Sequence, residues 1–396
     1  MLERIRKASE ALKGVVARTP LVSSSSLGRL YGVETHLKLE NLQKTGSFKV
    51  RGAYNLISSM SAEEKIRGVI TASLGNHAQG VAWAGALLGV KATVVMPETA
   101  SIIKYTATRG YGAELIFHGG FFDEAYEYAK KLANDKSMTF IPPFDDELVI
   151  AGQGTVGLEI LEDRPDIDTI VVPVGGGGLI AGIASAVKES GSDIKVVGVE
   201  AGASKSCMAS LKAGRPVDVE RASTIADGIA VKRVGEKTFP LIKKYVDDVV
   251  AVSEESIAEA ILKLLERKKV VVEGAGAVPV AAAIEGKLPA SSKKAAFVIS
   301  GGNIDVTILD RVLRLGLMKE GRIVKIQTVL RDVPGSLAEL TAVIAELKAN
   351  ILQVAHQREA EDVAVGLIRL DVILEVEGPE HAKRVLKALV EKGYGV

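Results

Sequence analysis

Cysteine is nearly absent from this sequence. The chain of 396 residues holds one, Cys207. A single thiol cannot form an internal disulfide, and it cannot supply the several thiolates of a cysteine-based zinc site. The sequence therefore fits a reducing compartment, and we expect Cys207 to be a small packed residue.

An excess of charge of one sign is absent as well. Lys and Arg together number 50 and Asp and Glu number 49, so the net charge is +1. A protein without a basic field has little electrostatic attraction for nucleic acid or for an anionic membrane. We therefore expect a small-molecule substrate and no nucleic-acid partner.

Long apolar runs are the third absence. The apolar stretches are short or interrupted by glycine, so we expect no membrane span and no membrane partner. The first 14 residues are charged and amphipathic, and they do not have the apolar segment and cleavage site of a signal peptide. These features predict a cytoplasmic protein.

The chain does contain a regular alternation of strand and helix patterns. Short β-branched runs alternate with alanine-rich helical stretches, which predicts an α/β fold with a mainly parallel sheet and crossover helices. We expect one compact α/β unit over about 70–135 and a larger one over about 150–310. The expected strands are 68–72, 91–96, 113–117, 169–174 and 195–200, and the clearest helices are 76–88, 101–109 and 122–134.

The last part of the chain has a different order of elements. A strand is followed by a helix, two strands and a second helix, which is the βαββα order of a ferredoxin-like unit. The expected ranges are 323–330, 337–349, 351–358, 364–374 and 380–392.

Lys49 lies where a strand pattern gives way to a helix pattern. Ser47 is expected to cap this helix, which would place Lys49 in its first turn. An ammonium group there faces the positive end of the helix dipole, so the position suits a neutral lysine that acts as a nucleophile or forms a Schiff base. Position alone nevertheless favours a solvated helix lysine, and the choice depends on the other motifs.

Three further turns follow predicted strands. Residues 71–77 lead into a helix whose free N–H groups would bind an anion, and His77 there is either a general base or a structural histidine. Residues 174–179 contain four consecutive glycines before a helix, which indicates a phosphate cradle or a tight turn. Residues 298–303 place Ser300 at a strand end, where ligands gather in α/β sheets.

The glycine run also allows a rival interpretation. The pattern Gly176-x-Gly178-x-x-Ala181, with Glu200 at the end of the next strand, satisfies a dinucleotide-binding fingerprint. An NAD-linked oxidoreductase would use it. That interpretation leaves Lys49 unexplained, and the fingerprint follows an α/β unit that already has an anion-binding turn.

An amine, a phosphate cradle and polar partners for a ring are together the requirements of pyridoxal phosphate. The four stretches, with Thr19-Pro20-Leu21 and the run from Phe144 to Thr155, resemble the threonine/serine dehydratase family of fold-type II pyridoxal phosphate enzymes over about residues 15–315. The resemblance implies that Lys49 bonds covalently to the cofactor, Phe48 packs against its ring, Asn76 contacts the ring hydroxyl and Ser300 meets the pyridine nitrogen. It assigns the phosphate to Gly175, Gly176, Gly177 and Gly178, and the substrate carboxylate to Ser73, Leu74, Gly75, Asn76 and His77.

The same resemblance suggests a cation site. Glu200 and Ser204 match positions that bind a structural cation in relatives, but Ser206 stands where some relatives have an acid. The expected ligand is therefore a monovalent cation or none.

Two positions narrow the chemistry. A neutral Ser300 cannot stabilise a pyridinium, which favours prompt expulsion of a β-substituent over transamination. Leu74 stands where racemases of the family carry a hydroxyl, so we expect elimination without racemisation. Lys49 would remove the α-proton, giving 2-oxobutanoate from threonine and pyruvate from serine.

The C-terminal module resembles an ACT domain. Its first loop, 330–337, offers amides for the carboxylate of an amino-acid effector. The resemblance implies that such modules pair across subunits and bind an amino acid between them, so we expect a homo-oligomer, a dimer or a tetramer. The alternative is a module that only assembles subunits. The expected effector residues are Asp332, Gly335, Ser336 and Asn350.

The resulting prediction is an allosteric threonine ammonia-lyase, which family habit links to isoleucine biosynthesis. A serine dehydratase or a β-replacement synthase is the alternative, and the oxidoreductase and a non-enzymatic amino-acid sensor are more remote. The expected domains are a catalytic region over 1–315, with a small subdomain at about 50–145, a linker over 316–321 and an ACT domain over 322–396.

Overall fold

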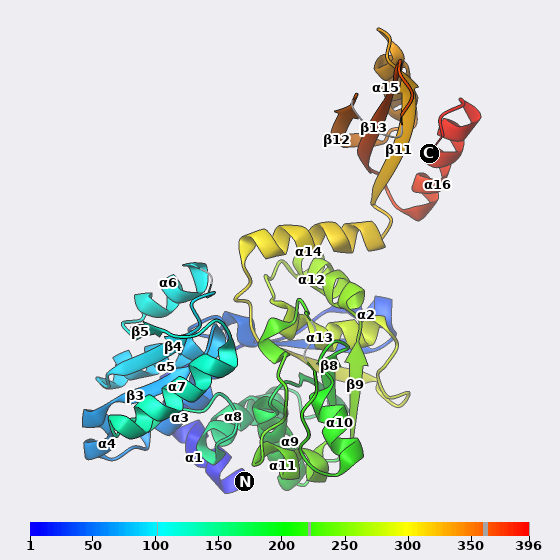
Figure 1. Cartoon of the computed structure of the whole chain (residues 1–396). Helices are drawn as coiled ribbons and strands as arrows, with labels where there is room; N and C mark the ends of the chain where they lie inside the picture. The colour runs from blue at the N-terminus through cyan, green and yellow to red at the C-terminus, as the bar shows by residue number, and fades with distance from the viewer. Residues whose placement is uncertain (101, 221–222, 359–362, 396) are drawn as a thin grey trace. The chain divides into compact units, whose positions relative to one another are not determined.

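The computed structural model describes residues 1–100, 102–220, 223–358 and 363–395, which form two compact units (Figure 1). The first unit is Met1–Ile308 and the second is Leu309–Val396. The division falls inside helix α14 (Val306–Lys319). The finer domain boundaries expected from the sequence stay a prediction.

The larger sheet of the first unit has six strands in the order β1-β2-β10-β7-β8-β9. Its strands run parallel except for β1, which pairs antiparallel with β2. Parallel sheets need apolar residues on both faces because crossover helices cover both, and every residue of β7 is buried. The strands are β1 (Leu21–Ser23), β2 (Glu34–Leu39), β7 (Thr169–Pro173), β8 (Lys195–Ala201), β9 (Asp248–Val252) and β10 (Lys294–Ile299).

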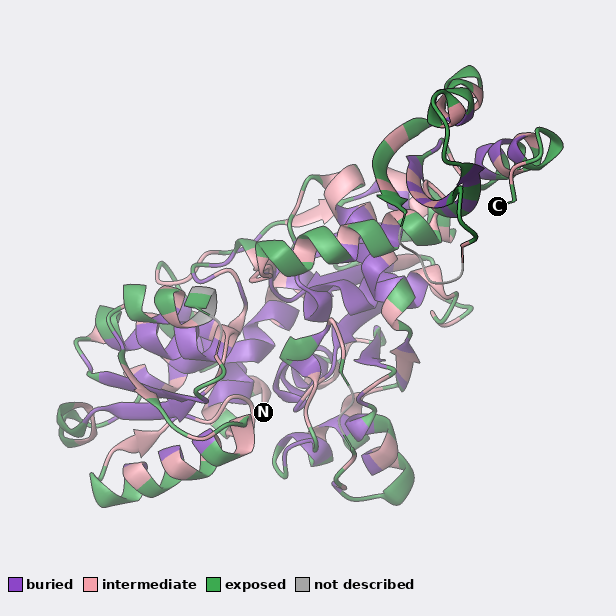
Figure 2. Ribbon diagram, turned by 45° about the horizontal axis from the view of Figure 1, so that its top comes forward, coloured by how far each residue is buried: buried purple, intermediate pink, exposed green. Residues whose placement is uncertain are grey.

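Helices surround this sheet, and Figure 2 shows that the strands and the inward faces of the helices are buried. Helices α8 and α9 pack together with the chain's N-terminal helix, and their facing side chains form an apolar cluster with β7 and β10. The helices of this part are α1 (Leu2–Leu12), α2 (Ser25–Tyr31), α8 (Glu147–Asp163), α9 (Gly178–Glu189), α10 (Ser206–Ala213), α11 (Thr238–Tyr245), α12 (Glu254–Lys268) and α13 (Gly274–Ile284), with short 3-10 turns η1 (Glu40–Leu42) and η2 (Asp227–Ile229).

A second, four-stranded parallel sheet lies within the same unit, in the order β5-β4-β3-β6. The predicted alternation is confirmed, and helix α5 covers the predicted range of 76–88. Ser101, expected to begin the next helix, lies outside the described residues. The elements are α3 (Lys49–Ser58), α4 (Ala62–Arg67), β3 (Val69–Ala72), α5 (Asn76–Leu88), β4 (Ala92–Met96), α6 (Ile102–Gly110), β5 (Glu114–Phe117), α7 (Phe122–Asp135) and β6 (Thr139–Phe140).

The second unit has the predicted βαββα order. Its antiparallel sheet runs β11-β13-β12, and the two helices pack their apolar residues against it, with Leu340, Leu370 and Leu389 fully buried. The elements are β11 (Ile323–Arg331), α15 (Ser336–Glu346), β12 (Asn350–Gln357), β13 (Leu367–Glu375) and α16 (Pro379–Glu391).

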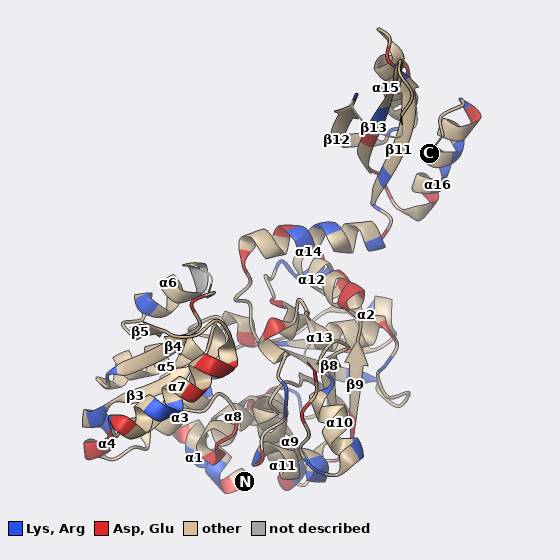
Figure 3. Cartoon of the chain, viewed as in Figure 1, with Lys and Arg blue, Asp and Glu red and all other residues tan. Residues whose placement is uncertain are grey.

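Charged residues of both signs are interspersed along the ribbon in Figure 3, as the balanced composition implies. In the part of the chain that the structure describes, none of the helices combines the length and apolarity that a bilayer crossing requires.

Candidate active site

A cavity of about 930 Å³ lies in the first unit, where the carboxyl ends of strands from both sheets meet. Parallel strands collect ligand-binding turns at their carboxyl ends, and the turns after β3, β7 and β10 all line this cavity. The structure brings together here every residue expected to bind cofactor or substrate: Phe48, Lys49, Ser73, Leu74, Gly75, Asn76, His77, Gly175, Gly176, Gly177, Gly178 and Ser300.

Lys49 is the first residue of α3, as expected, but Ser47 is not its cap. The N-cap is Phe48, and the Ser47 hydroxyl is buried without a hydrogen-bond partner among the described residues. The reason is a tertiary pairing: Ser47 forms a β-bridge with Gly301, and the Phe48 N–H donates to the Ser300 carbonyl at 3.1 Å. This pairing fixes the start of α3 against the end of β10.

The Lys49 ammonium group lies in a weakly solvated place. Its Nζ donates to the Pro143 carbonyl at 2.7 Å. Burial lowers the pKa of Lys49 to about 8, although the negative charge of Glu273 opposes the shift. A lysine with this pKa is partly neutral near pH 7 to 8 and can act as an amine nucleophile or base.

His77 is neutral in this site. Burial, and then the charge of Lys49, lower its pKa to about 3, although the hydrogen bond to Ile141 opposes the shift. Nε2 lies 3.0 Å from the Ile141 carbonyl, which can only accept, so Nε2 carries the proton. Nδ1 is then a bare acceptor, and it has no partner among the described residues. His77 therefore offers a substrate no positive charge.

The four glycines fit closely between neighbouring segments. A Cβ on Gly176 would lie 2.3 Å from the Phe144 ring, and Gly177 has a φ of +94° at the N-cap of α9. Behind the loop, the Gly176 carbonyl accepts from Thr238 Oγ1 at 2.7 Å and from the Gly235 N–H at 3.1 Å. The unpaired N–H groups of the first turn of α9 are left for an anion.

Two residues of the site were missed by the sequence reasoning. Glu273 Oε1 accepts a hydrogen bond from Asn76 Nδ2 at 2.7 Å, and Asn303 Nδ2 donates to Asn76 Oδ1 at 2.7 Å. Both line the cavity. Asn303 belongs to the turn that drew attention to Ser300, whereas no local pattern marks Glu273.

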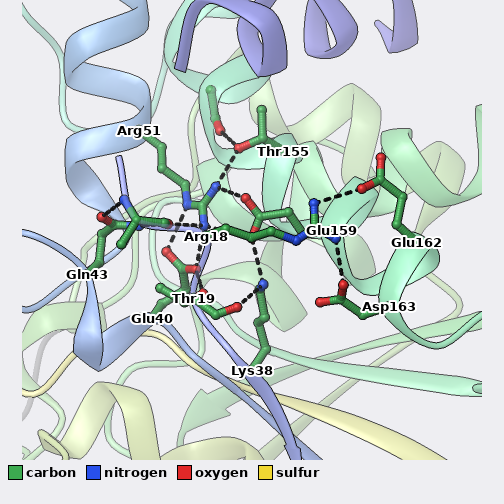
Figure 4. A network of polar contacts seen from close by, with 12 residues as sticks. Arg18, Thr19, Lys38, Glu40, Gln43, Arg51, Thr155, Glu159, Glu162 and Asp163 are labelled. Carbon is green, nitrogen blue, oxygen red and sulfur yellow. Dashed lines mark hydrogen bonds and ion pairs between the residues drawn. The ribbon is translucent and has the colours of Figure 1, made fainter. Parts of the chain in front are cut away.

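A buried network of charges includes Arg51, in the first turn of α3, and joins this helix to neighbouring segments (Figure 4). Arg51 bonds to Glu40 through Nε and Nη2, at 2.9 and 2.7 Å, and to Glu159 through Nη1 at 2.6 Å. Lys38 Nζ donates to Glu159 at 2.6 Å and to the Thr19 carbonyl at 2.6 Å. Two cations and two carboxylates thus join β2, α3, α8 and the N-terminal segment without net charge.

Glu200 lies outside the cavity. Its carboxylate oxygens accept from the backbone N–H groups of Cys207, at 2.7 Å, and Met208, at 2.9 Å. Burial raises the pKa of Glu200 to about 7. A buried carboxylate bonded in this way has no access to a ribose hydroxyl, which removes the acidic residue that the dinucleotide fingerprint requires.

The predicted cation ligands are not gathered into an evident metal site. Ser204 Oγ donates to the Val231 carbonyl at 3.1 Å. Within residues 1–100, 102–220, 223–358 and 363–395, no group of three His, Cys, Asp or Glu side chains has a metal-binding arrangement. The cation site at Glu200 and Ser204 stays a prediction.

In the second unit, the expected effector residues lie at two ends of the sheet. Gly335, with a φ of +98°, is the N-cap of α15, and the Asp332 carboxylate pairs with Arg358 at 3.1 Å. Asn350 opens β12 opposite Glu375, while the loop with Asp332 follows the other end of β11. One copy therefore does not bring Asn350 together with the other three residues.

The cavity suits the groups of pyridoxal phosphate. The amine of Lys49 matches its aldehyde, the glycine loop with the start of α9 matches its phosphate, and Asn76 offers an N–H to a ring oxygen. Ser300, which is 3% exposed, supplies a neutral hydroxyl for a ring nitrogen. The donor set is thus chemically complete for this cofactor.

Two family models match the chain. One, described as pyridoxal-phosphate dependent enzyme, matches residues 12–301, and one described as ACT domain matches residues 319–391. The L-threonine ammonia-lyase of Thermotoga maritima is 53% identical over 395 residues, with 100% of this chain and 98% of that protein covered.

Solved structures give the same fold. The processed form of threonine deaminase isoform 2 from Solanum lycopersicum is 38% identical with a TM-score of 0.74, and the match covers 79% of this chain and 93% of that one. Maize serine racemase is 36% identical with a TM-score of 0.76, and the match covers 80% and 98%.

Proposed function

We propose, from the premise that the chain belongs to the pyridoxal-phosphate dependent enzyme family, that it converts L-threonine to 2-oxobutanoate and ammonia. The premise rests on the family match over 290 of 396 residues, 12–301. The observation that carries the proposal is the position of Lys49, whose amine with a pKa of about 8 lies in one cavity with the glycine loop, Asn76 and Ser300. The choice of threonine is supported by the full-length relative that carries that activity in its name.

Each group that lines the cavity has a separate role in the proposed reaction. Bound pyridoxal phosphate supplies an electron sink for the negative charge that develops at the substrate's α-carbon. Lys49 would hold the cofactor through Nζ, and its amine, when free and neutral, would remove the substrate's α-proton. The turn from Ser73 to His77, at the positive end of α5, binds the substrate carboxylate. Loss of the β-hydroxyl as water, followed by hydrolysis, gives the 2-oxo acid and ammonia.

Ser300 and Leu74 support elimination over other outcomes. A neutral hydroxyl at the ring nitrogen does not stabilise a positive charge there, so a long-lived carbanion is disfavoured. Leu74 lines the cavity with an apolar side chain that cannot donate a proton. This observation weighs against racemisation, even though maize serine racemase is among the similar structures. A serine dehydratase or a β-replacement synthase is the second candidate, because the same residues would serve either.

The test combines the spectrum of the protein with its products. Purified protein should be yellow and should lose its visible band on borohydride reduction, and threonine should yield 2-oxobutanoate. Lys49→Ala should lose both the band and the turnover. Wild-type turnover by Lys49→Ala would refute the mechanism, while faster turnover of serine than of threonine would favour the second candidate.

The second unit is proposed to bind an amino-acid effector at Asp332, Gly335 and Ser336. The positive end of the α15 helix dipole and the φ of Gly335 suit an amino acid's carboxylate. A site that also used Asn350 would need a second copy of the chain, because one copy holds Asn350 at the other end of the sheet. A homo-oligomer in the cytoplasm is consistent with this arrangement and is part of the proposal.

A further inference from the structure

Glu273 occupies an unusual place for a glutamate. It is the N-cap of α13, a position that prefers Ser, Thr, Asp or Asn because their short side chains bond back to the helix. The Glu273 side chain makes no such capping bond. It is 6% exposed and turns to Asn76, 197 residues earlier in the chain.

The hydrogen bonds fix the orientation of the Asn76 amide from both sides. On one side, the Thr45 carbonyl can only accept, so Asn303 must present Nδ2 to it, and the second hydrogen of that Nδ2 meets Asn76 Oδ1. On the other side, the carboxylate of Glu273 can only accept, so it must face Asn76 Nδ2. The two requirements agree, and they leave one hydrogen of Asn76 Nδ2 available to the cavity.

Two glycines make room for this arrangement. A Cβ on Gly301 would lie 2.3 Å from Glu273 Oε1, and a Cβ on Gly46 would lie 2.5 Å from Asn303 Oδ1. Both distances are far below van der Waals contact. The turn after β10 and the loop before α3 are therefore shaped around the side chains that hold Asn76.

We propose that Glu273 is a positioning residue of the cofactor site, which, together with Asn303, aims the remaining N–H of Asn76 at the ring oxygen of pyridoxal phosphate. The inference rests on the proposed function. A donor in this place favours the ionised form of the ring oxygen. The carboxylate also places a negative charge near Lys49, the residue that holds the same cofactor.

Two substitutions of Glu273 separate the effect of its hydrogen bond to Asn76 from the effect of its negative charge. Glu273→Gln keeps an oxygen that can accept from Asn76 but removes the charge, whereas Glu273→Ala removes both. Glu285→Gln is the matched control, because Glu285 is the C-cap of the same helix and bonds to Ser253, away from the cavity. Asn303→Ala tests the other side of Asn76 without touching Glu273.

Each apoprotein is titrated with pyridoxal phosphate, and the growth of the visible band gives the affinity. The pH at which the band of the loaded protein changes is then measured. A hydrogen bond to a charged group is worth enough that Glu273→Ala should weaken the affinity about tenfold. Asn303→Ala should weaken it in the same direction. Glu273→Gln should keep the affinity within about threefold but shift the pH at which the band changes. Glu285→Gln should match the wild type in its affinity for pyridoxal phosphate and in the pH at which the band changes.

One result would overturn the proposal, and a different result would refute the proposed function on which it rests. Affinities within a factor of about two for both Glu273→Ala and Asn303→Ala, with an unchanged band, would overturn it, since a lost hydrogen bond normally has a larger effect. Failure of the wild-type protein to bind the cofactor would instead refute the proposed function. Melting curves of each variant identify a loss of folding. If Glu273→Ala does not fold, the conservative Glu273→Gln still tests the position through the pH at which the band changes.

Discussion

Arg51, in the first turn of the helix that begins with Lys49, forms a buried, two-point ion pair with Glu40. Arg51 Nε and Nη2 lie 2.9 and 2.7 Å from the two carboxylate oxygens, and neither side chain is more than 1% exposed. Burial alone would raise the pKa of Glu40, but the Arg51 guanidinium and Lys38 ammonium hold it below its usual range. The pair therefore ties the 3-10 turn after β2 to α3.

Removing one partner of this pair should destabilise the first unit strongly. Arg51→Met leaves the Glu40 carboxylate buried without its ion-pair partner and leaves Glu159 with Lys38 alone. Breaking a buried pair in this way costs about 3–5 kcal/mol. Arg18→Met is the control, because Arg18 is half exposed and pairs with Glu162 and Asp163, and surface pairs contribute less than about 1 kcal/mol. Urea unfolding followed by the fluorescence of Trp83 measures both. Equal losses would contradict the role of the buried network.

The same pair predicts a pH dependence. Because the folded-state pKa of Glu40 is lowered, its contribution to stability is present above the unfolded-state pKa of about 4.3 and is lost as pH falls through the folded value. The wild type should therefore lose part of its stability only below about pH 4, whereas the double variant Glu40→Gln, Arg51→Met should lose less over that range. If both proteins lost the same amount of stability on acidification, the loss would come from carboxylates other than Glu40.

Lys49 should react with pyridoxal phosphate at a lower pH than an ordinary lysine. The groups that face its amine are the Glu273 carboxylate, which raises the pKa, and neutral His77, while burial lowers the pKa to about 8. Only the unprotonated amine attacks an aldehyde, so the rate of formation of the visible band in the apoprotein should rise with pH around a midpoint near 8. Free Nα-acetyl-lysine is the control, with a midpoint near about 10.4. Coincident midpoints would show that Lys49 is well solvated.

The lowered pKa of Lys49 also predicts how the stability of the apoprotein changes with pH. Between the folded pKa of Lys49 and the unfolded value of about 10.4, the unfolded chain binds more protons, so stability should rise with pH in that interval. Lys49→Met should remove this increment. Melting temperatures between pH 8 and pH 10 compare the two proteins, and a parallel course would contradict the lowered pKa.

Gly176→Ala should disturb the glycine loop. The new Cβ would overlap the Phe144 ring at 2.3 Å, and such overpacking costs about 1–3 kcal/mol. Displacement of the loop should also weaken cofactor binding at least about tenfold, since its N–H groups then miss the phosphate. Gly110→Ala is the control, because a Cβ at Gly110 meets nothing within 4 Å. Unchanged affinity in Gly176→Ala would remove the loop from the phosphate site.

Leu74→Ser should introduce racemisation. The serine hydroxyl can donate a proton where leucine cannot, and a positioned acid contributes about 100-fold or more. Leu74→Ala is the control, since it removes the leucine side chain without adding a hydroxyl. Chiral chromatography of serine recovered from the reaction measures the exchange. Equal racemisation by the two variants would mean that the hydroxyl at this position does not decide the outcome.

Gly335→Ala should impair the response to an effector and leave turnover without effector unchanged. At a φ of +98° an alanine is strained, so the start of α15 and its N–H groups would shift. Gly393→Ala is the control, with a φ of +89° and open space around it. Calorimetric titration with isoleucine and with valine, beside threonine kinetics, compares the variants. Wild-type affinity in Gly335→Ala would place the effector elsewhere.

The sequence by itself determined the order of the elements and the chemistry at the ends of three strands. Hydrophobic periodicity and β-branched runs are properties of short segments, so they predicted the smaller and the larger α/β unit and the C-terminal βαββα unit. The lysine stretch, the turn with Asn76, the glycine run and Ser300 are local motifs too, and parallel strands bring their carboxyl ends to one place. The meeting of Lys49 and the glycine loop in one cavity was therefore predictable without a structure.

Only the tertiary structure decided which polar groups meet across the chain. Lys38 and Glu40 alternate with apolar residues as a half-exposed strand would, yet both are fully buried because Arg51 and Glu159 neutralise them. Ser47 has the chemistry of a cap but is engaged with Gly301. Glu273 reaches Asn76 across 197 residues of sequence. The physical reason is common to all three: the free energy of a buried polar group depends on its partner, and each partner is set by the packing of distant segments.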